Sequence, residues 1–320
     1  MNSGAPGPLA VRRVKFFGRH RGEVNSSTFS PDGQRLLTTQ SGRLLWRLTG
    51  HAGPRQFCHF SPDGRLFATT SHDCTTRLWD VAEAKCLRVL KGYQQSVEMA
   101  SFSPDGKQLA SGGWNRQVTL WEVQSGQLGT TTVGMGWLVH AHGRCLQATG
   151  SWDSTICIWD LRMGTPATFH QELEGHSGNI SCLCYSASGL LVSWTIHIWK
   201  PSTRSLLVQL KGHVTWVKSI AFSRWVTAGQ CRLLPHVWDC NTGKCIETLK
   251  QGVLDVAHAC AFIPDGKLLV SGAADQARCQ SPLLDQITRS LSDISPPQWF
   301  SDLKPVSPCP EPMQPGGMNS

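Results

Sequence analysis

The chain has 320 residues, of which 40% are hydrophobic and 16% charged, and its formal net charge of +8 comes from 30 Lys and Arg against 22 Asp and Glu. This length and composition allow a sizeable buried core, which excludes a chain that is disordered throughout. Residues 1–13 lack the apolar run of a signal peptide, and no stretch approaches the roughly 18 apolar residues of a membrane span. We therefore expect a soluble intracellular protein without membrane contact, in the cytoplasm, with the nucleus as the alternative.

Charge and cysteine content also limit which classes of partner and cofactor the chain is expected to bind. The densest basic stretch, residues 12–15, is too short to form a nucleic-acid-binding arm by itself. The 13 cysteines are scattered without a Cys-x-x-Cys pair, and the closest two, Cys182 and Cys184, would place both thiols on one face of a strand. We therefore expect buried reduced thiols, no metal, no cofactor, and a protein or peptide partner rather than nucleic acid.

A repeated unit organises most of the chain. Each unit ends in a tryptophan, and these residues are Trp79, Trp121, Trp159, Trp199 and Trp238, spaced by 42, 38, 40 and 39 residues. A Pro-Asp-Gly turn recurs in phase with them, in motifs that begin at Ser30, Ser61, Ser103 and Ile263. A period in this range is typical of the blade of a β-propeller.

One unit shows how the repeat is expected to fold. Residues 57–60 form a strand, and Pro62-Asp63-Gly64 makes a turn, because Pro fixes φ and Gly accepts a positive φ. Residues 66–70 and 75–79 supply two further strands around a short turn at Asp73, and residues 87–90 supply a fourth. Such a sheet is apolar on both faces, so it can bury them only against neighbouring sheets.

Short motifs indicate the family. Leu-Trp-Asp at Leu78, Ile-Trp-Asp at Ile158 and Val-Trp-Asp at Val237 accompany Gly-His motifs at His51, His176 and His213. With this repetition the chain resembles the WD-repeat family over about residues 9 to 278. The resemblance implies an all-β WD-repeat β-propeller with nominally seven blades, closed by an N-terminal strand near residues 11–17 that joins the last blade.

Seven first-strand or turn signals agree with that number of blades, and they lie near Pro31, Pro62, Pro104, Gly143, Ser188, Arg224 and Pro264. The predicted organisation is a flexible N-terminus at residues 1–10, the propeller at residues 11–280, and a disordered tail at residues 281–320. The tail is Pro-rich, with eight prolines in residues 282–320. One short amphipathic helix over residues 283–291 is the alternative for part of it.

The family resemblance also implies a buried hydrogen-bonded tetrad. It joins the Gly-His histidine, a turn Asp, a hydroxyl on the second strand and the blade tryptophan. In this chain His51, Asp73 and Trp79 match it, with Thr69 or Ser71 as the hydroxyl. We expect this structural tetrad to be the only complete one.

Several other blades are expected to be shortened or degenerate. The unit ending at Trp121 carries Tyr93 in place of the histidine and Asn115 in place of the turn Asp. From the histidine position to the tryptophan there are 28 residues in the complete unit, but only 23 and 25 in the units ending at Trp199 and Trp238. Residues 232–235 should interrupt the third strand of the latter. The first unit is about eleven residues short, which indicates a three-stranded blade, an altered transcript or a faulty gene model.

No enzyme signature is found, because the chain lacks a Gly-x-Ser-x-Gly elbow, a His-Glu-x-x-His motif and a phosphate loop. We therefore expect a non-enzymatic interaction scaffold. In the family, the turn between the second and third strands and the start of the first strand open on one rim that is often used for recognition. The rim residues would be His72, Trp114, Trp152, Trp194 and Trp216. Tryptophans are typical of interaction hot spots, but an equally weighted alternative is that these indoles pack over adjacent loops.

A narrower function is the alternative to a general scaffold. Trp159-Asp160-Leu161-Arg162, with Asp153 six residues before the tryptophan, resembles the Trp-Asp-x-Arg box of some WD-repeat proteins. Those proteins serve as substrate receptors of cullin-based ubiquitin ligases. No other blade tryptophan is followed by Arg at that position.

Overall fold

The computed structural model of the chain consists of β-strands and turns in the residues that it describes. These are residues 15–17, 24–40, 50–114, 117–133, 138–142, 146–151, 154–160, 168–173, 176, 178–180, 182–185, 191–193, 197–200, 205–210, 217–223, 226–231, 235–239, 243–248, 257–264, 269–273 and 279–281. Within them, no helix has the length and apolarity needed to cross a bilayer.

The described strands form seven antiparallel sheets. The first four sheets contain β2 (Val24–Phe29) and β3 (Leu36–Gln40); β4 (Arg55–Phe60), β5 (Leu66–Ser71), β6 (Thr76–Asp80) and β7 (Cys86–Leu90); β8 (Val97–Phe102), β9 (Gln108–Gly113), β10 (Gln117–Glu122) and β11 (Leu128–Val133); and β12 (Leu138–His142), β13 (Leu146–Ser151), β14 (Ile156–Asp160) and β15 (Thr168–Leu173).

The other three contain β16 (Leu183–Tyr185), β17 (Leu191–Ser193), β18 (His197–Lys200) and β19 (Ser205–Gln209); β20 (Val217–Ser223), β21 (Val226–Cys231), β22 (Pro235–Asp239) and β23 (Cys245–Thr248); and β24 (Ala257–Phe262), β25 (Leu269–Ala273) and β26 (Cys279–Ser281) with β1 (Lys15–Phe17).

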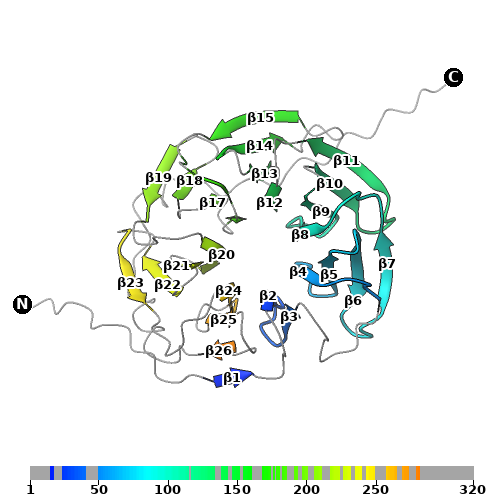
Figure 1. The fold of residues 1–320 in the computed structure, drawn as a ribbon, viewed down its shortest axis with the longest axis horizontal. Helices are drawn as coiled ribbons and strands as arrows, with labels where there is room; N and C mark the ends of the chain where they lie inside the picture. Colours follow the sequence, from blue (N-terminus) through cyan, green and yellow to red (C-terminus); the bar gives the residue numbers. More distant parts are fainter. Residues whose placement is uncertain are drawn as a thin grey trace, which may run out of the picture.

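The sheets lie around a common centre, with β4 and β8 close to it and β7 and β11 at the periphery (Figure 1). First strands contact one another in a cycle, from β2 through β4, β8, β12, β16, β20 and β24 back to β2. The strand β1 pairs antiparallel with β26, so that Lys15 lies opposite Ser281 and Phe17 opposite Cys279. The N-terminal part of the chain therefore completes the sheet formed by its last repeat.

The Pro-Asp-Gly turns have the same hydrogen bonds wherever the structure describes them in full. In the turn at Ser61, the serine Oγ donates to Asp63 Oδ1 at 2.5 Å and accepts from the Leu66 N–H at 2.9 Å. The turns at Ser30 and Ser103 repeat this pattern. The glycines of the three turns have φ values of 69°, 69° and 72°, which explains why glycine recurs at this position.

These turns also pack from one sheet to the next. A Cβ added at Gly64 would lie 3.4 Å from Pro31, and one at Gly106 would lie 3.7 Å from Pro62. At Gly33 the neighbour is Ile263 of the last repeat, only 2.9 Å away. The first and last repeats are therefore in contact through their turns as well as through β2 and β24.

This contact predicts a difference between two otherwise similar substitutions. Gly64→Ala places alanine at a positive φ and should lower the free energy of unfolding by about 1 kcal/mol. Gly33→Ala has the same φ and also forces a methyl group against Ile263, so we expect a further loss of about 1 kcal/mol. Urea denaturation of the two variants measures the difference. Equal losses would mean that Gly33 and Ile263 do not pack as the structure has them.

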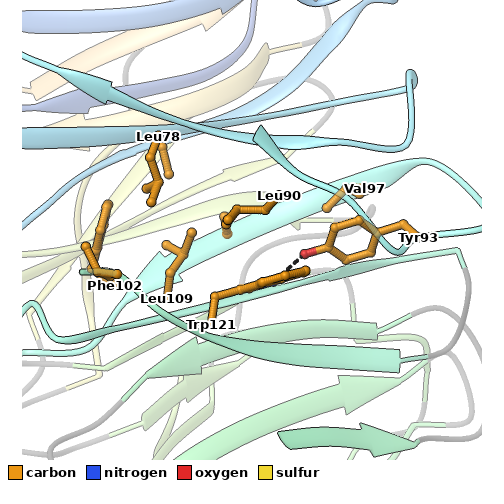
Figure 2. Packing of buried hydrophobic residues seen from close by; sticks show 10 residues of the cluster. Leu78, Leu90, Tyr93, Val97, Phe102, Leu109 and Trp121 are labelled. Carbon is orange, nitrogen blue, oxygen red and sulfur yellow. Dashed lines mark hydrogen bonds between the residues drawn. The ribbon is translucent and has the colours of Figure 1, made fainter. Parts of the chain in front are cut away.

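Neighbouring sheets bury their apolar faces against each other. Between the second and third sheets, Leu78 and Leu90 face Leu109 and Trp121, as Figure 2 shows. Leu109 and Leu78 are 0% and 1% exposed, so side chains from both sheets share one core. This is the inter-blade packing that the two apolar faces of each unit predicted.

Two predicted irregularities can be compared with the structure. The interruption predicted at residues 232–235 is wrong at Pro235, which begins β22 and pairs with Gln230. Proline is tolerated as the first residue of a strand, where its missing N–H does not break a ladder. The first sheet has two described strands, and residues 41–49, which follow them, lie outside the described residues. The N-terminus at 1–10 and the tail from residue 282 also lie outside, whereas Ser281 ends β26.

Candidate functional site

The structure brings His51, Asp73 and Trp79 together through one hydroxyl. His51 Nδ1 lies 2.8 Å from Asp73 Oδ2, and its Nε2 lies 2.8 Å from Thr69 Oγ1. The indole Nε1 of Trp79 donates to the same Thr69 Oγ1 at 2.8 Å. Of the two candidate hydroxyls, Thr69 is thus the member of the network. Ser71 instead donates to the carbonyl of Pro54 at 2.9 Å.

The charge state of this network follows from its burial. Burial lowers the pKa of His51 despite the opposing effect of Asp73, so the imidazole is neutral near pH 7. Burial acts to raise the pKa of Asp73, but hydrogen bonds from Thr75, Ala52 and His51 outweigh it and leave that pKa below its ordinary value. The consistent assignment has His51 Nδ1–H donating to the carboxylate and Thr69 Oγ–H donating to Nε2.

In the third sheet a phenol stands where the second sheet has an imidazole. Trp121 Nε1 donates to Tyr93 OH at 2.7 Å and to Ser111 Oγ at 2.8 Å, and the two hydroxyls are hydrogen-bonded to each other. Burial raises the pKa of Tyr93 to about 12, which keeps the phenol protonated. Tyr93 therefore takes over the polar contact of the missing histidine, whereas Asn115 lies outside the described residues.

The fourth sheet contains part of the predicted ligase-adaptor box. Trp159 Nε1 donates to Thr149 Oγ1 at 2.8 Å. Asp160 ends β14, with its backbone opposite Leu146 and Thr168. The other two residues of the box, Asp153 and Arg162, lie outside the described residues. The box remains a prediction from the sequence.

A histidine pair that the sequence analysis missed joins His176, which precedes the fifth sheet, to His197 on β18. His176 stacks on His197 with ring centroids 4.4 Å apart. The centroids of the His176 and His197 rings lie 5.9 and 5.8 Å from the centroid of the Trp199 ring. Burial lowers the pKa of His176 to about 3, and the nearby His197 adds to the effect. Burial also lowers the pKa of His197. The signal in the sequence is His197 two residues before the blade tryptophan.

This pair predicts that acid destabilises the protein. The folded state keeps His176 neutral, whereas the unfolded chain binds a proton below its ordinary pKa of 6.5. Stability should therefore decline as the pH falls from 6.5 towards 3. Lowered pKa values of His51 and His59 act in the same direction, so the contribution of the pair is isolated by comparison with His176→Phe. Urea denaturation at pH 7 and pH 5 should show a smaller decline in the variant, and an unchanged decline would contradict the prediction.

The described thiols and acidic groups give no metal site. Among the residues that the structure describes, no three His, Cys, Asp or Glu side chains are grouped to hold a metal ion. Cys58 and Cys260 are buried on equivalent first strands, and burial raises the pKa of each thiol to about 12. The expectation of buried thiols is wrong for Cys245, which is exposed because it lies on the outer strand β23.

Two of the five predicted rim residues are described, and they occupy equivalent places. His72 follows β5 and Trp114 follows β9. Their backbone N–H groups donate to the backbone carbonyls of Pro54 and Ser96, at 3.0 and 3.3 Å, just before the first strand of each sheet. Both side chains are exposed, Trp114 to 48%. Trp152, Trp194 and Trp216 lie outside the described residues.

Trp114 has a polar partner that the sequence analysis missed. Its indole Nε1 donates to Glu98 Oε1 at 3.0 Å, and Ser96 Oγ donates to the same oxygen at 2.5 Å. The rim therefore combines an exposed aromatic surface with a carboxylate, which is a suitable combination for recognition of a cation.

The sheets, the repeated turns and the histidine–hydroxyl–tryptophan network define a repeat protein of the WD type. A family model described as "WD domain, G-beta repeat" matches residues 11–44, 42–80, 84–122, 131–160, 167–200 and 243–277, and the chain belongs to this family. The unit ending at Trp238 lies between the matched segments, although β20 to β23 form a four-stranded sheet.

The chain is similar to WD repeat-containing protein 38 of Homo sapiens, with 67% identity over 302 residues, which are 88% of this chain and 96% of that protein. It is 58% identical to the protein of the same name from Mus musculus over 242 residues, 70% of this chain and 80% of that protein. The nuclear distribution protein PAC1 of Komagataella phaffii is 37% identical over 87 residues, covering 25% of this chain and 17% of that protein.

Proposed function

We propose that this chain is a non-enzymatic interaction scaffold that binds a protein or peptide partner on the rim carrying His72 and Trp114. The observation that carries the proposal is the equivalent, exposed placement of these two side chains at the same corner of neighbouring sheets. Tryptophan removes a large apolar area from water on binding, so an exposed one is a frequent hot spot. Rim loops can also vary without unfolding the sheets that hold them.

A rigid support for this rim is part of the proposal. We infer a closed, seven-bladed propeller within an intracellular protein. The cycle of contacts among first strands, the pairing of β1 with β26 and the contact of Gly33 with Ile263 support closure. Closure packs every sheet between two neighbours and leaves only short, protected sheet edges, which favours a stable platform.

Proximity labelling with the full chain, followed by mass spectrometry, tests the proposal. A partner identified in this way should be captured by the purified wild-type protein and lost from Trp114→Ala. The matched control is Leu128→Ala on the outer strand β11, because Leu128 is 61% exposed but far from the rim turn in its own sheet. Equal capture by the wild-type protein and Trp114→Ala would contradict binding at this rim.

The cullin-based ubiquitin ligase receptor is the second candidate function. The motif that favours it is Trp159-Asp160-Leu161-Arg162 with Asp153. If the box acts as proposed, the wild-type protein should capture the ligase adaptor and Arg162→Ala should not. No capture by either protein would exclude this function.

A further inference from the structure

The side chains of Trp114 and Glu98 form an organised pair on the rim. Glu98 Oε1 accepts two hydrogen bonds, from Trp114 Nε1 at 3.0 Å and from Ser96 Oγ at 2.5 Å. Trp114 is nevertheless 48% exposed. The exposed indole and the carboxylate that accepts its N–H therefore lie side by side on the rim.

The backbone explains why the pair is held in place. The register of β8 against β9 shifts between Val97 and Met99, so Glu98 lies in an irregularity of the ladder that redirects its side chain. On the opposite strand, a Cβ at Gly113 would lie 2.4 Å from the Ser96 carbonyl oxygen and 2.8 Å from the Glu98 nitrogen. Only glycine permits this close approach, which brings the start of β8 next to the residue that follows Gly113.

The chemistry of the pair favours a positively charged ligand. Glu98 belongs to neither of the ion pairs that join two described residues, His51–Asp73 and Arg65–Asp63. A carboxylate beside an aromatic ring attracts a cation both by charge and by the negative face of the ring. The bond from the indole N–H to the carboxylate further polarises the ring in the favourable direction.

The neighbouring sheet provides a comparison within the same chain. The residues in the places of Glu98 and Trp114 are Gln56 and His72. The Gln56 side chain is neutral, and its Oε1 accepts from Asn25 Nδ2 at 3.3 Å. The carboxylate and the large ring therefore occur together in the third sheet and not in the second.

We propose that Trp114 and Glu98 bind an arginine side chain of the partner, an inference that rests on the proposed function of the rim. A guanidinium group can stack its plane on the indole while its N–H groups donate to the Glu98 carboxylate. Lysine can satisfy the charge but does not stack in this way. The partner segment is therefore one that presents an exposed arginine.

A small-molecule probe tests this directly on the full chain. N-acetyl-arginine-N-methylamide is titrated into the ¹⁵N-labelled protein, and the indole N–H signal of Trp114 is assigned by its loss in Trp114→Phe. We expect a saturable shift of this signal with a dissociation constant on the order of 1 mM or weaker. Glu98→Gln, which keeps the shape and an acceptor oxygen, should weaken binding about threefold to fivefold. The norleucine analogue should give no saturable shift.

The matched control is Glu122→Gln, an exposed glutamate on β10 that should leave the titration unchanged. The inference is overturned by the absence of a saturable shift, by an equal response to norleucine, or by unchanged binding in Glu98→Gln. Its failure is distinguishable from failure of the rim proposal. If partner capture depends on Trp114 but not on Glu98, only the arginine inference is wrong. If the protein binds arginine but Trp114→Ala captures the partner as well as the wild-type protein does, the proposed function is wrong.

Discussion

Replacing Asp73 with alanine should lower the free energy of unfolding by about 1 to 3 kcal/mol. Asp73 Oδ2 accepts from His51 Nδ1 and from the Ala52 N–H, at 2.8 and 2.9 Å, and Oδ1 accepts from Thr75 Oγ1 at 2.6 Å. The His51 side chain is fully buried, so removal of the carboxylate takes away the acceptor 2.8 Å from Nδ1 and leaves only the more distant Thr75 Oγ1, at 3.2 Å, beside it. Chemical denaturation measures the loss.

Two other aspartates serve as controls for this substitution. Asp63 is a turn residue that accepts from Ser61 and from the Arg65 N–H at the surface, so Asp63→Ala should have a smaller effect. Asp153→Ala should also be milder, because the sequence supplies no histidine partner in its unit. Losses that are equal for the three variants, or larger for Asp63 or Asp153, would mean that the network around His51 is not the best-connected one.

The choice between Thr69 and Ser71 shows what the sequence could not decide. Both residues lie on the same face of β5, because they are two positions apart in a strand. In the structure Trp79 pairs with Phe67, which makes Thr69 its diagonal neighbour on that face. Ser71 lies one step further along and reaches the Pro54 carbonyl instead. Strand periodicity could predict the two candidates, but only the register of β5 against β6 selects one.

The contacts of Tyr93 also could not be predicted from the sequence. The sequence identified a tyrosine in the place of a histidine and therefore predicted a degenerate unit. A phenol is longer than an imidazole, and its hydroxyl both donates and accepts, so Tyr93 reaches Trp121 and Ser111 directly. Whether a substituted side chain reaches the old partners depends on the packing around it, here against Leu90 and Val97. That packing is a property of two adjacent sheets, and no single repeat reveals it.

The fold was easier to predict than the rim, for a physical reason. Each repeat needs the same turn, the same buried tryptophan and the same apolar faces, so the pattern recurs along the chain and predicted the family shown here. Glu98 has no such recurrence. Its contact with Trp114 requires the irregular register of β8 and the close approach at Gly113, both of which arise only when the strands pair. The residues at the positions of Glu98 and Trp114 differ between the second and third sheets, which removes the periodic signal.

Truncation of a rim tryptophan should produce the largest functional effect. If the partner binds where we propose, Trp114→Ala should weaken its affinity by about 2 kcal/mol or more, which is about thirtyfold. The expected loss is large because the exposed ring of Trp114 would be buried in the complex and because its removal also leaves Glu98 without one of its two donors. Trp152→Ala should act in the same direction, since the sequence places Trp152 before the turn Asp of the next unit.

Affinities are measured by calorimetry or surface plasmon resonance with the partner found by labelling, after thermal unfolding shows that each variant folds. Leu128→Ala reports the effect of removing an exposed apolar side chain away from the rim. Unchanged affinity in both tryptophan variants would move the binding site to the opposite face or to the C-terminal tail. A loss confined to Arg162→Ala would instead favour the ubiquitin-ligase receptor, because Arg162 belongs to the Trp-Asp-x-Arg box and not to the predicted rim. The four variants together therefore assign the surface as well as the strength of binding.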